Sequence, residues 1–135
     1  MIYLLDTNTL SAAINQNQDV IVQIETAFAN GHTLAISLIT YFEIERGLEI
    51  PKYRTKNTRF KAWLTRLEIL EMTTNTMDVA ARIWQQLRAK GLILEDADTI
   101  IAATAICEIA VLVTDNTKHF ARIPHLQLEN WIERA

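Results

Sequence analysis

The sequence predicts an α/β fold in which a mainly parallel central sheet is flanked by helices. Along the 135 residues, short apolar runs of strand length alternate with helical patterns of ten or more residues, as in parallel sheets with crossover helices. Half of the residues are hydrophobic and 21% are charged, a composition typical of globular proteins. No linker or internal repeat divides the chain, so we expect one domain over residues 1–135.

Four short apolar runs predict strands. The first, IYLL, stops abruptly at Asp6, and the last, VLVT, stops in the same way at Asp115. A weaker run near the end of the chain favours a fifth strand. The predicted strands cover residues 2–5, 33–37, 68–71, 111–114 and 126–128.

Four longer segments predict helices from the spacing of their apolar residues. Three of them are amphipathic, and two of these end at Gly31 and Gly91, which favours a helix stop. The fourth has almost no polar face, so we expect it to be buried in the centre of the fold. The predicted helices cover residues 19–31, 38–50, 75–91 and 96–110.

Acidic residues stand at the ends of strands and at the starts of helices. Asp6 and Asp115 each follow a predicted strand, whereas Glu43 and Asp98 lie in the first turns of predicted helices. Each acid taken alone has a structural explanation, as a turn residue or a favourable helix-start charge. Because ligands bind beyond the carboxyl ends of parallel strands, the set predicts a common site. Asp96 lies two residues from Asp98 and does not share its helix face, so we expect at most one of them in that site.

Four carboxylates at one half-buried edge repel one another unless a cation balances their charge. Oxygen ligands without His or Cys favour hard ions, so the predicted ion is Mg²⁺, with Mn²⁺ as a substitute, rather than zinc. Such ions activate water and stabilise the attacking and leaving oxygens of an in-line displacement. The acids therefore favour a phosphodiester substrate.

Other chemistries lack their motifs in this sequence. There is no Gly-rich phosphate loop, no Cys or His metal spacing and no G-x-S-x-G turn. A strand-end Asp is also the nucleophile of some phosphotransferases, but these need a second Asp where this chain has Asn8. We expect Cys107 to be buried and reduced. Without a signal peptide or an apolar run of membrane length, we expect a cytoplasmic protein with no membrane partner.

The segment 51–66 carries six basic side chains and no acid, although the formal net charge of the chain is −3. Tyr53, Phe60 and Trp63 are interleaved with these charges. A solvated helix face is the ordinary explanation of such a run, and contact with a phosphate backbone is the alternative. Both interpretations stay open at the level of sequence.

The acidic pattern resembles that of PIN-domain ribonucleases and, among them, the VapC-type toxins of bacterial type II toxin–antitoxin modules. Four stretches carry the resemblance, in family order and across nearly the whole chain: YLLDTNTLSA, ISLITYFEIERGL, DADTIIAATA and LVTDNTKHFARIPHLQLENW. The resemblance implies a three-layer PIN fold. On matching positions it implies that Asp6 and Asp98 ligate the metal ion, and that Glu43 helps to hold the ion or orients the attacking water.

The resemblance leaves the fourth position open between two residues. The family commonly has an acid or Asn two residues after the strand Thr, where this chain has Asn116, while Asp115 comes one residue earlier. Either residue would complete the outer shell of the site. Thr7 and Asn8 match polar residues that orient the first Asp or bind near it, and an Asx-type turn is the structural alternative.

The resemblance also implies a function. It indicates a divalent-metal-dependent endoribonuclease that cleaves tRNA, rRNA or mRNA, forms a homodimer and is inhibited by an antitoxin protein. Arg46, Lys52, Arg54 and Lys56 would then contact RNA or the antitoxin. Two other classes remain open. One is a binding module that has lost catalysis, against which the intact acids argue. The other is a nuclease outside toxin–antitoxin biology, and a small upstream gene for a DNA-binding antitoxin would favour the toxin over it.

Overall fold

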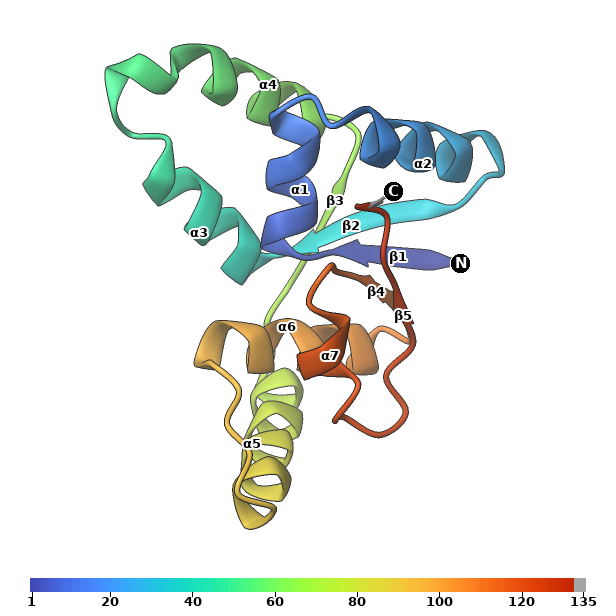
Figure 1. The fold of residues 1–135 in the computed structure, drawn as a ribbon, viewed down its shortest axis with the longest axis vertical. Helices are drawn as coiled ribbons and strands as arrows, with labels where there is room; N and C mark the ends of the chain where they lie inside the picture. Colours follow the sequence, from blue (N-terminus) through green and yellow to red (C-terminus); the bar gives the residue numbers. More distant parts are fainter. Residues whose placement is uncertain (133–135) are drawn as a thin grey trace.

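The computed structural model describes residues 1–132 of the chain and is built around a five-stranded sheet (Figure 1). The strand order is β3-β2-β1-β4-β5, and all four pairings are parallel. The predicted parallel sheet is therefore confirmed. The strands are β1 (Ile2–Leu5), β2 (Thr33–Ser37), β3 (Glu68–Leu70), β4 (Val111–Val113) and β5 (Leu128–Glu129).

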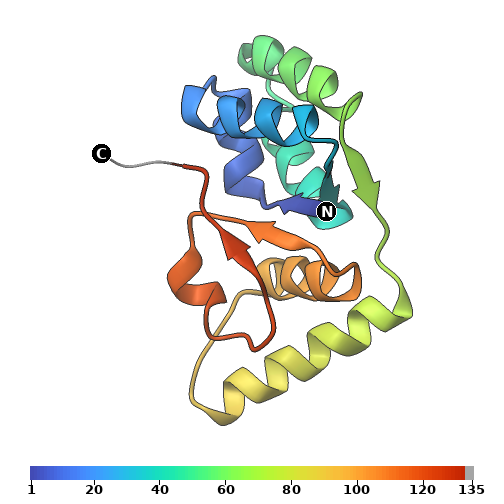
Figure 2. The same cartoon turned by 90° about the vertical axis from the view of Figure 1, so that its right-hand side faces the viewer.

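Helices cover both faces of the sheet and make three layers (Figures 1 and 2). One face carries α1 (Thr7–Ile14), α2 (Gln18–Ala29), α3 (Leu38–Gly47) and α4 (Arg54–Leu64), with the short 3₁₀ helix η1 (Pro51–Tyr53) before α4. The other carries α5 (Thr74–Ala89), α6 (Asp96–Cys107) and α7 (Thr117–Phe120). None of the helices among residues 1–132 is both long and apolar enough to span a membrane.

The sheet separates two hydrophobic cores because strand side chains alternate between its faces. In β1, Leu5 packs with Leu10 of α1 and Ile24 of α2, whereas its neighbour Leu4 packs on the opposite face with Ile101 of α6. All five side chains are 1% exposed or less. The predicted burial of the apolar helix is confirmed, since α6 buries six residues.

The position of β1 decides where a site can form. It lies in the middle of the sheet, pairing with β2 on one side and β4 on the other. The chain leaves β1 for one face and reaches β4 from the other, so strand order reverses between these two strands, where α/β proteins bind ligands. The backbone N–H of Asp6 donates to the carbonyl of Val113 at 3.0 Å. This bond sets the ends of β1 and β4 side by side.

The structure differs from the sequence prediction in three helices and one cysteine. Helix α4 lies outside the four predicted helices, although a helix was one interpretation of segment 51–66. Neither α1 nor α7 is predicted: α7 is only four residues long, and α1 begins with Thr-Asn-Thr, which has weak helix propensity. Tertiary contacts stabilise α1, because Leu10 and Ala13 are fully buried. The predicted burial of Cys107 is wrong. The residue is half-exposed at the end of α6, where Asn75 donates to its Sγ at 3.6 Å.

Candidate active site

Asp6 serves both as a helix cap and as a member of the acidic site. Its Oδ1 accepts from the backbone N–H of Thr9 at 2.8 Å, which caps α1. The residue is only 4% exposed. Burial raises the pKa of Asp6, and the negative charge of Asp115 adds to the effect, while hydrogen bonds from Thr114 and Thr9 oppose it. The structural explanation of this residue is therefore confirmed, and its chemical role stays a prediction.

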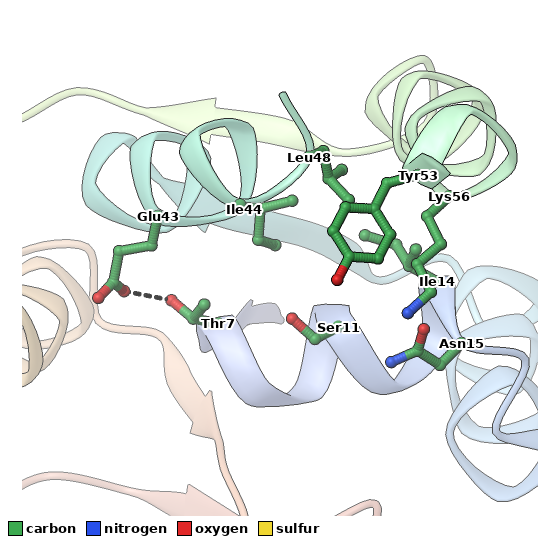
Figure 3. Close-up of a pocket in the computed structure, with 10 residues that line it drawn as sticks. Thr7, Ser11, Ile14, Asn15, Glu43, Ile44, Leu48, Tyr53 and Lys56 are labelled. Carbon is green, nitrogen blue, oxygen red and sulfur yellow. Dashed lines mark hydrogen bonds between the residues drawn. The ribbon is translucent and has the colours of Figure 1, made fainter. Parts of the chain in front are cut away.

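Glu43 is held by a chain of hydroxyl groups at the end of β2 and the start of α3. The Thr7 hydroxyl lies 2.6 Å from Glu43 Oε1 and 3.2 Å from Thr40 Oγ1 (Figure 3 draws the Thr7–Glu43 bond). A hydroxyl has one hydrogen, so Thr7 donates to the carboxylate and accepts from Thr40. Ser37 then donates to Thr40 at 3.4 Å, and Ser37 and Thr40 are both fully buried. The chain of donors fixes one oxygen of Glu43.

Asp98 lies in the first turn of α6 and is half-buried. The pKa of Asp98 is raised to about 6, first by burial and then by the negative charges of Asp6, Glu95 and Glu43, in that order of importance. Its neighbour Asp96 is exposed and instead lines a groove between α5 and α6. The expectation that at most one of these two acids faces the site is confirmed.

The two candidates for the fourth position differ in their surroundings. Asn8 Nδ2 donates to Asp115 Oδ1 at 3.5 Å, so Asp115 stands across from the start of α1. The side-chain oxygen of Asn116 bonds His119 Nδ1, and its backbone N–H donates to Thr114 Oγ1 at 2.9 Å. Of the two residues, only Asp115 has a charge that affects Asp6. We therefore favour Asp115 as the fourth acid.

The donor set suits a hard divalent ion bound mainly through water. Across residues 1–132, no three His, Cys, Asp or Glu side chains converge closely enough to hold an ion together. Mg²⁺ keeps several waters and takes one or two carboxylates, so a trio is not needed. Asp6 and Asp98 are the two acids whose charged forms are disfavoured where they lie. A nearby cation would stabilise the charged forms of both Asp6 and Asp98, and two carboxylates are as many as Mg²⁺ usually takes.

The structure divides the basic residues of segment 51–66 into two groups. Three have structural partners: Arg59 donates to the Ile14 carbonyl at 3.1 Å, Lys61 pairs with Glu45 and Arg66 with Glu25. The other three, which we call the basic cluster, form no ion pair within the described part of the chain. They are Lys52, Arg54 and Lys56.

Two lysines of the basic cluster lie against one aromatic side chain, Tyr53. Lys52 and Lys56 each place Nζ near the Tyr53 ring, 5.1 and 5.2 Å from its centroid. Arg46 lies outside segment 51–66. Its guanidinium is 3.8 Å from the Glu43 carboxylate and 5.1 Å from the centroid of the Phe42 ring. The cluster is free to bind an anion without breaking an ion pair.

A groove connects Glu43 to the basic cluster (Figure 3). It has a volume of about 260 Å³ and lies between α1, α3 and the start of α4. Glu43 stands at one end, and Lys56 and Asn15 point toward each other at the other. Its lining consists of Thr7, Ser11, Ile14, Asn15, Glu43, Ile44, Gly47, Leu48, Tyr53 and Lys56.

Several residues at the site are not evident from the sequence. Thr40, Thr114 and Glu95 affect the acids, yet nothing in their spacing distinguishes them from ordinary helix-start and loop residues. Thr7 was expected beside the first Asp, but its hydroxyl bonds Glu43. The only available signal was the number of Thr and Ser residues that follow the ends of β1, β2 and β4.

Fold and site together define an α/β protein with acidic side chains at the carboxyl ends of parallel strands. The chain belongs to the PIN-domain family, whose model, described as "PIN domain", matches residues 3–126. The resemblance to VapC-type PIN domains is confirmed by curated relatives. The chain is 39% identical over 132 residues to Ribonuclease VapC2 of Rickettsia felis, covering 97% of this chain and 98% of that protein.

Further relatives agree in sequence and in structure. The tRNA(fMet)-specific endonuclease VapC of Salmonella typhimurium is 31% identical over 130 residues, covering 96% of this chain and 97% of that protein. A solved structure of VapBC2 from Rickettsia felis, bound to a DNA fragment from its promoter, superimposes with a TM-score of 0.89 at 38% identity. That match covers 97% of this chain and 99% of the other. The fold and the family thus agree along nearly the whole chain.

Proposed function

We propose that this chain is the toxin of a toxin–antitoxin pair and hydrolyses RNA phosphodiester bonds with a divalent ion, Mg²⁺ or Mn²⁺, held by Asp6 and Asp98. One observation carries the proposal: burial and the charges of Asp6, Glu95 and Glu43 raise the pKa of Asp98 to about 6. A carboxylate in such surroundings gains from a cation. The names of the relatives support RNA as the substrate, because they are ribonucleases and one is specific for tRNA(fMet).

Each residue of the site has a part in this reaction. When bound, the ion balances the carboxylates, lowers the pKa of bound water and stabilises charge on the phosphate oxygens. Glu43, with one oxygen fixed by Thr7, orients the attacking water through its other oxygen. Asp115 lies close enough for its charge to affect Asp6, and it orients groups in the outer shell together with Asn8. Asn116 supports this turn from its bond with His119.

Basic side chains hold the RNA backbone in the proposed complex. The basic cluster has no competing ion pairs in the described structure, and Arg46 stands next to Glu43. Together they place positive charge near Glu43, through Arg46, and at the opposite end of the groove, through Lys56, which favours the path of a phosphate backbone. The same charges offer a contact for an antitoxin.

We also infer that an antitoxin protein binds this chain and that the chain forms a homodimer. The solved relative from Rickettsia felis is a complex named VapBC2, which supports the antitoxin as a partner. Sedimentation of the purified chain, alone and after co-expression with the product of a neighbouring gene, tests both inferences. A monomer that binds no such product would contradict them.

A cleavage assay tests the enzymatic proposal. Purified protein is incubated with mixed tRNA and rRNA, in Mg²⁺ or in EDTA, beside the variants Asp98→Asn and Asp96→Asn. We expect discrete cuts that need the metal, and Asp98→Asn should abolish them. Asp96→Asn is the matched control, because it removes an exposed acid from the same helix turn and should leave cleavage unchanged.

Calorimetry gives a second readout that does not depend on activity. The protein should bind Mn²⁺, and Asp98→Asn should weaken this binding while Asp96→Asn should not. Cleavage in EDTA, or full activity of Asp98→Asn, would overturn the metal mechanism. A wild-type protein that neither cuts RNA nor binds the ion would instead indicate a binding module.

A further inference from the structure

We propose that the groove between α1, α3 and α4 holds one unpaired RNA base beside the scissile phosphate, and that Asn15, Ser11 and Tyr53 select this base. The inference rests on the proposed ribonuclease function and deepens it, because it assigns the source of sequence preference. Glu43 lies at one end of the groove, so whatever occupies the groove is a neighbour of the reacting phosphate (Figure 3).

The floor of the groove is a polar stripe along α1. Thr7, Ser11 and Asn15 are four residues apart and therefore lie on one side of the helix. At about 1.5 Å per residue the stripe spans about 12 Å. That length accommodates one nucleotide between the acidic end and the basic cluster.

The walls of the groove are apolar and suit the flat face of a base. Ile14 and Ile44 are buried beside it, and Leu48 is half-buried. The volume of about 260 Å³ holds a single nucleoside and is far too small for a duplex. Proteins read RNA sequence mainly on bases that are unpaired and turned outward, so the shape favours a single-stranded loop or end.

The polar groups of the groove provide both donors and acceptors. Asn15 is exposed and offers an N–H donor next to a carbonyl acceptor. An amide in this form pairs in a bidentate manner with adenine. The Tyr53 hydroxyl points toward Ser11 across the groove (Figure 3). Adenine is therefore the base that we expect at this position.

The charges at the two ends match the backbone of a nucleotide. Glu43 lies at one end of the groove, where Asp6 and Asp98 would hold the ion nearby, and the Lys56 ammonium lies at the other end (Figure 3). A base in the groove has a phosphate on each side, so one phosphate would reach the ion while the next meets the ammonium. A protein segment in the groove is the alternative occupant, and the test separates the two.

The experiment uses the full chain and a single-stranded RNA pool randomised over eight positions, with sequencing of the cut ends. Wild type should prefer adenine at one position next to the cut. In Asn15→Ala, the ratio of kcat/KM for adenine over the other bases at that position should fall about tenfold, and Ser11→Ala should reduce it less. Gln23→Ala, which removes an exposed amide from α2 outside the groove, is the matched control and should leave the ratio unchanged.

A binding measurement separates this proposal from the cleavage proposal. In EDTA, wild type should bind the tetranucleotide UAUU more tightly than UUUU, and Asn15→Ala should lose the difference. An unchanged base preference in both groove variants would overturn the inference, as would equal binding of the two tetranucleotides. If Asn15→Ala weakened only the binding of an antitoxin peptide, the groove would belong to a protein partner. A protein that bound the adenine oligonucleotide but cut no RNA would contradict the proposed ribonuclease activity and still support the proposed base-binding groove.

Discussion

The acidic edge and the basic cluster are built in opposite ways. At the acidic edge, Thr7 and Thr9 fix carboxylate oxygens at 2.6 and 2.8 Å, and the hydroxyls behind Glu43 are fully buried. In the basic cluster, the ammonium groups of Lys52 and Lys56 rest only near an aromatic ring, more than 5 Å from its centroid. The side chains of the acidic edge are therefore held in a single geometry, whereas the lysines of the basic cluster keep their conformational freedom.

The difference matches two separate demands of a hydrolase. Groups that act on the reacting atoms contribute most when their geometry is fixed before the substrate arrives. Groups that bind a flexible backbone need only reach it, and long basic side chains adapt to different paths. Changes at the acidic edge should therefore affect the rate, whereas changes in the basic cluster should affect binding.

The variant Thr40→Val should disturb the rigid acidic edge more than any other change proposed here. It removes one buried hydroxyl from the chain that ends on Glu43 and nearly keeps the volume. Supporting hydrogen bonds of this kind are worth about 10–100-fold, so we expect kcat to fall by about that factor with little change in KM. The measurement is steady-state cleavage of one defined RNA.

Two controls accompany this variant. Thr40→Ser keeps the hydroxyl and should restore most of the rate. Thr104→Val removes another buried hydroxyl, which bonds the Ile100 carbonyl within α6, and should leave kcat unchanged. A Thr40→Val enzyme with the wild-type rate would show that Glu43 needs no such support.

Neutralising the basic cluster tests the adaptable region. With Lys52, Arg54 and Lys56 changed to Gln, KM should rise about tenfold while kcat stays near that of wild type. The slope of log affinity against log salt should decrease by about 2, since each phosphate contact on a single strand contributes about 0.7. Titration of labelled RNA at four salt concentrations measures this slope. The control is the double variant Lys61→Gln, Arg66→Gln, which removes charges held in ion pairs. An equal change in KM and salt slope in this control would show that RNA binding does not depend on the basic cluster in particular.

The smallest expected effect concerns stability. The pKa of Asp98 is raised from 3.8 to about 6 in the folded chain, so the folded state binds this proton more tightly than the unfolded state. The stabilisation is complete below about pH 4 and is lost as the pH rises through about 6. The full difference is worth about 3 kcal/mol, and screening by water at this half-exposed side chain reduces it to about 1 kcal/mol.

The variant Asp98→Asn should not lose stability as the pH rises, because its amide stays uncharged. In EDTA at pH 8, the variant should therefore be more stable than wild type by about 1 kcal/mol, and the two should converge near pH 4. Urea unfolding at both pH values measures the difference. Mg²⁺ should reverse the order, because it stabilises only the protein that binds it. A variant less stable than wild type at pH 8 without metal would contradict the proposed repulsion among the acids.

The sequence was most informative where one physical rule acted alone. Short apolar runs located the strands, and helical periodicity located α2, α3, α5 and α6. Gly31 and Gly91 do adopt positive φ values, 78° and 71°, just after α2 and α5. The acids after β1 and β4 were found because parallel strands must end together. By contrast, α1 depends on burial of Leu10 and Ala13, which local propensity does not reveal. The hydrogen bonds of Thr7 with Thr40 and Glu43 join α1 to α3, so no spacing along the chain predicts them.

The central position of β1 also has a consequence for the order of synthesis. Tyr3 pairs with Leu34 on one side and with Val111 on the other, so one edge of the first strand made has no partner until β4 exists. Asp6 consequently waits for Asp98 and Asp115, and domains assemble as their last elements leave the ribosome. For a chain proposed to cut RNA, the acidic site can therefore assemble only after β4 and Asp115 have been made.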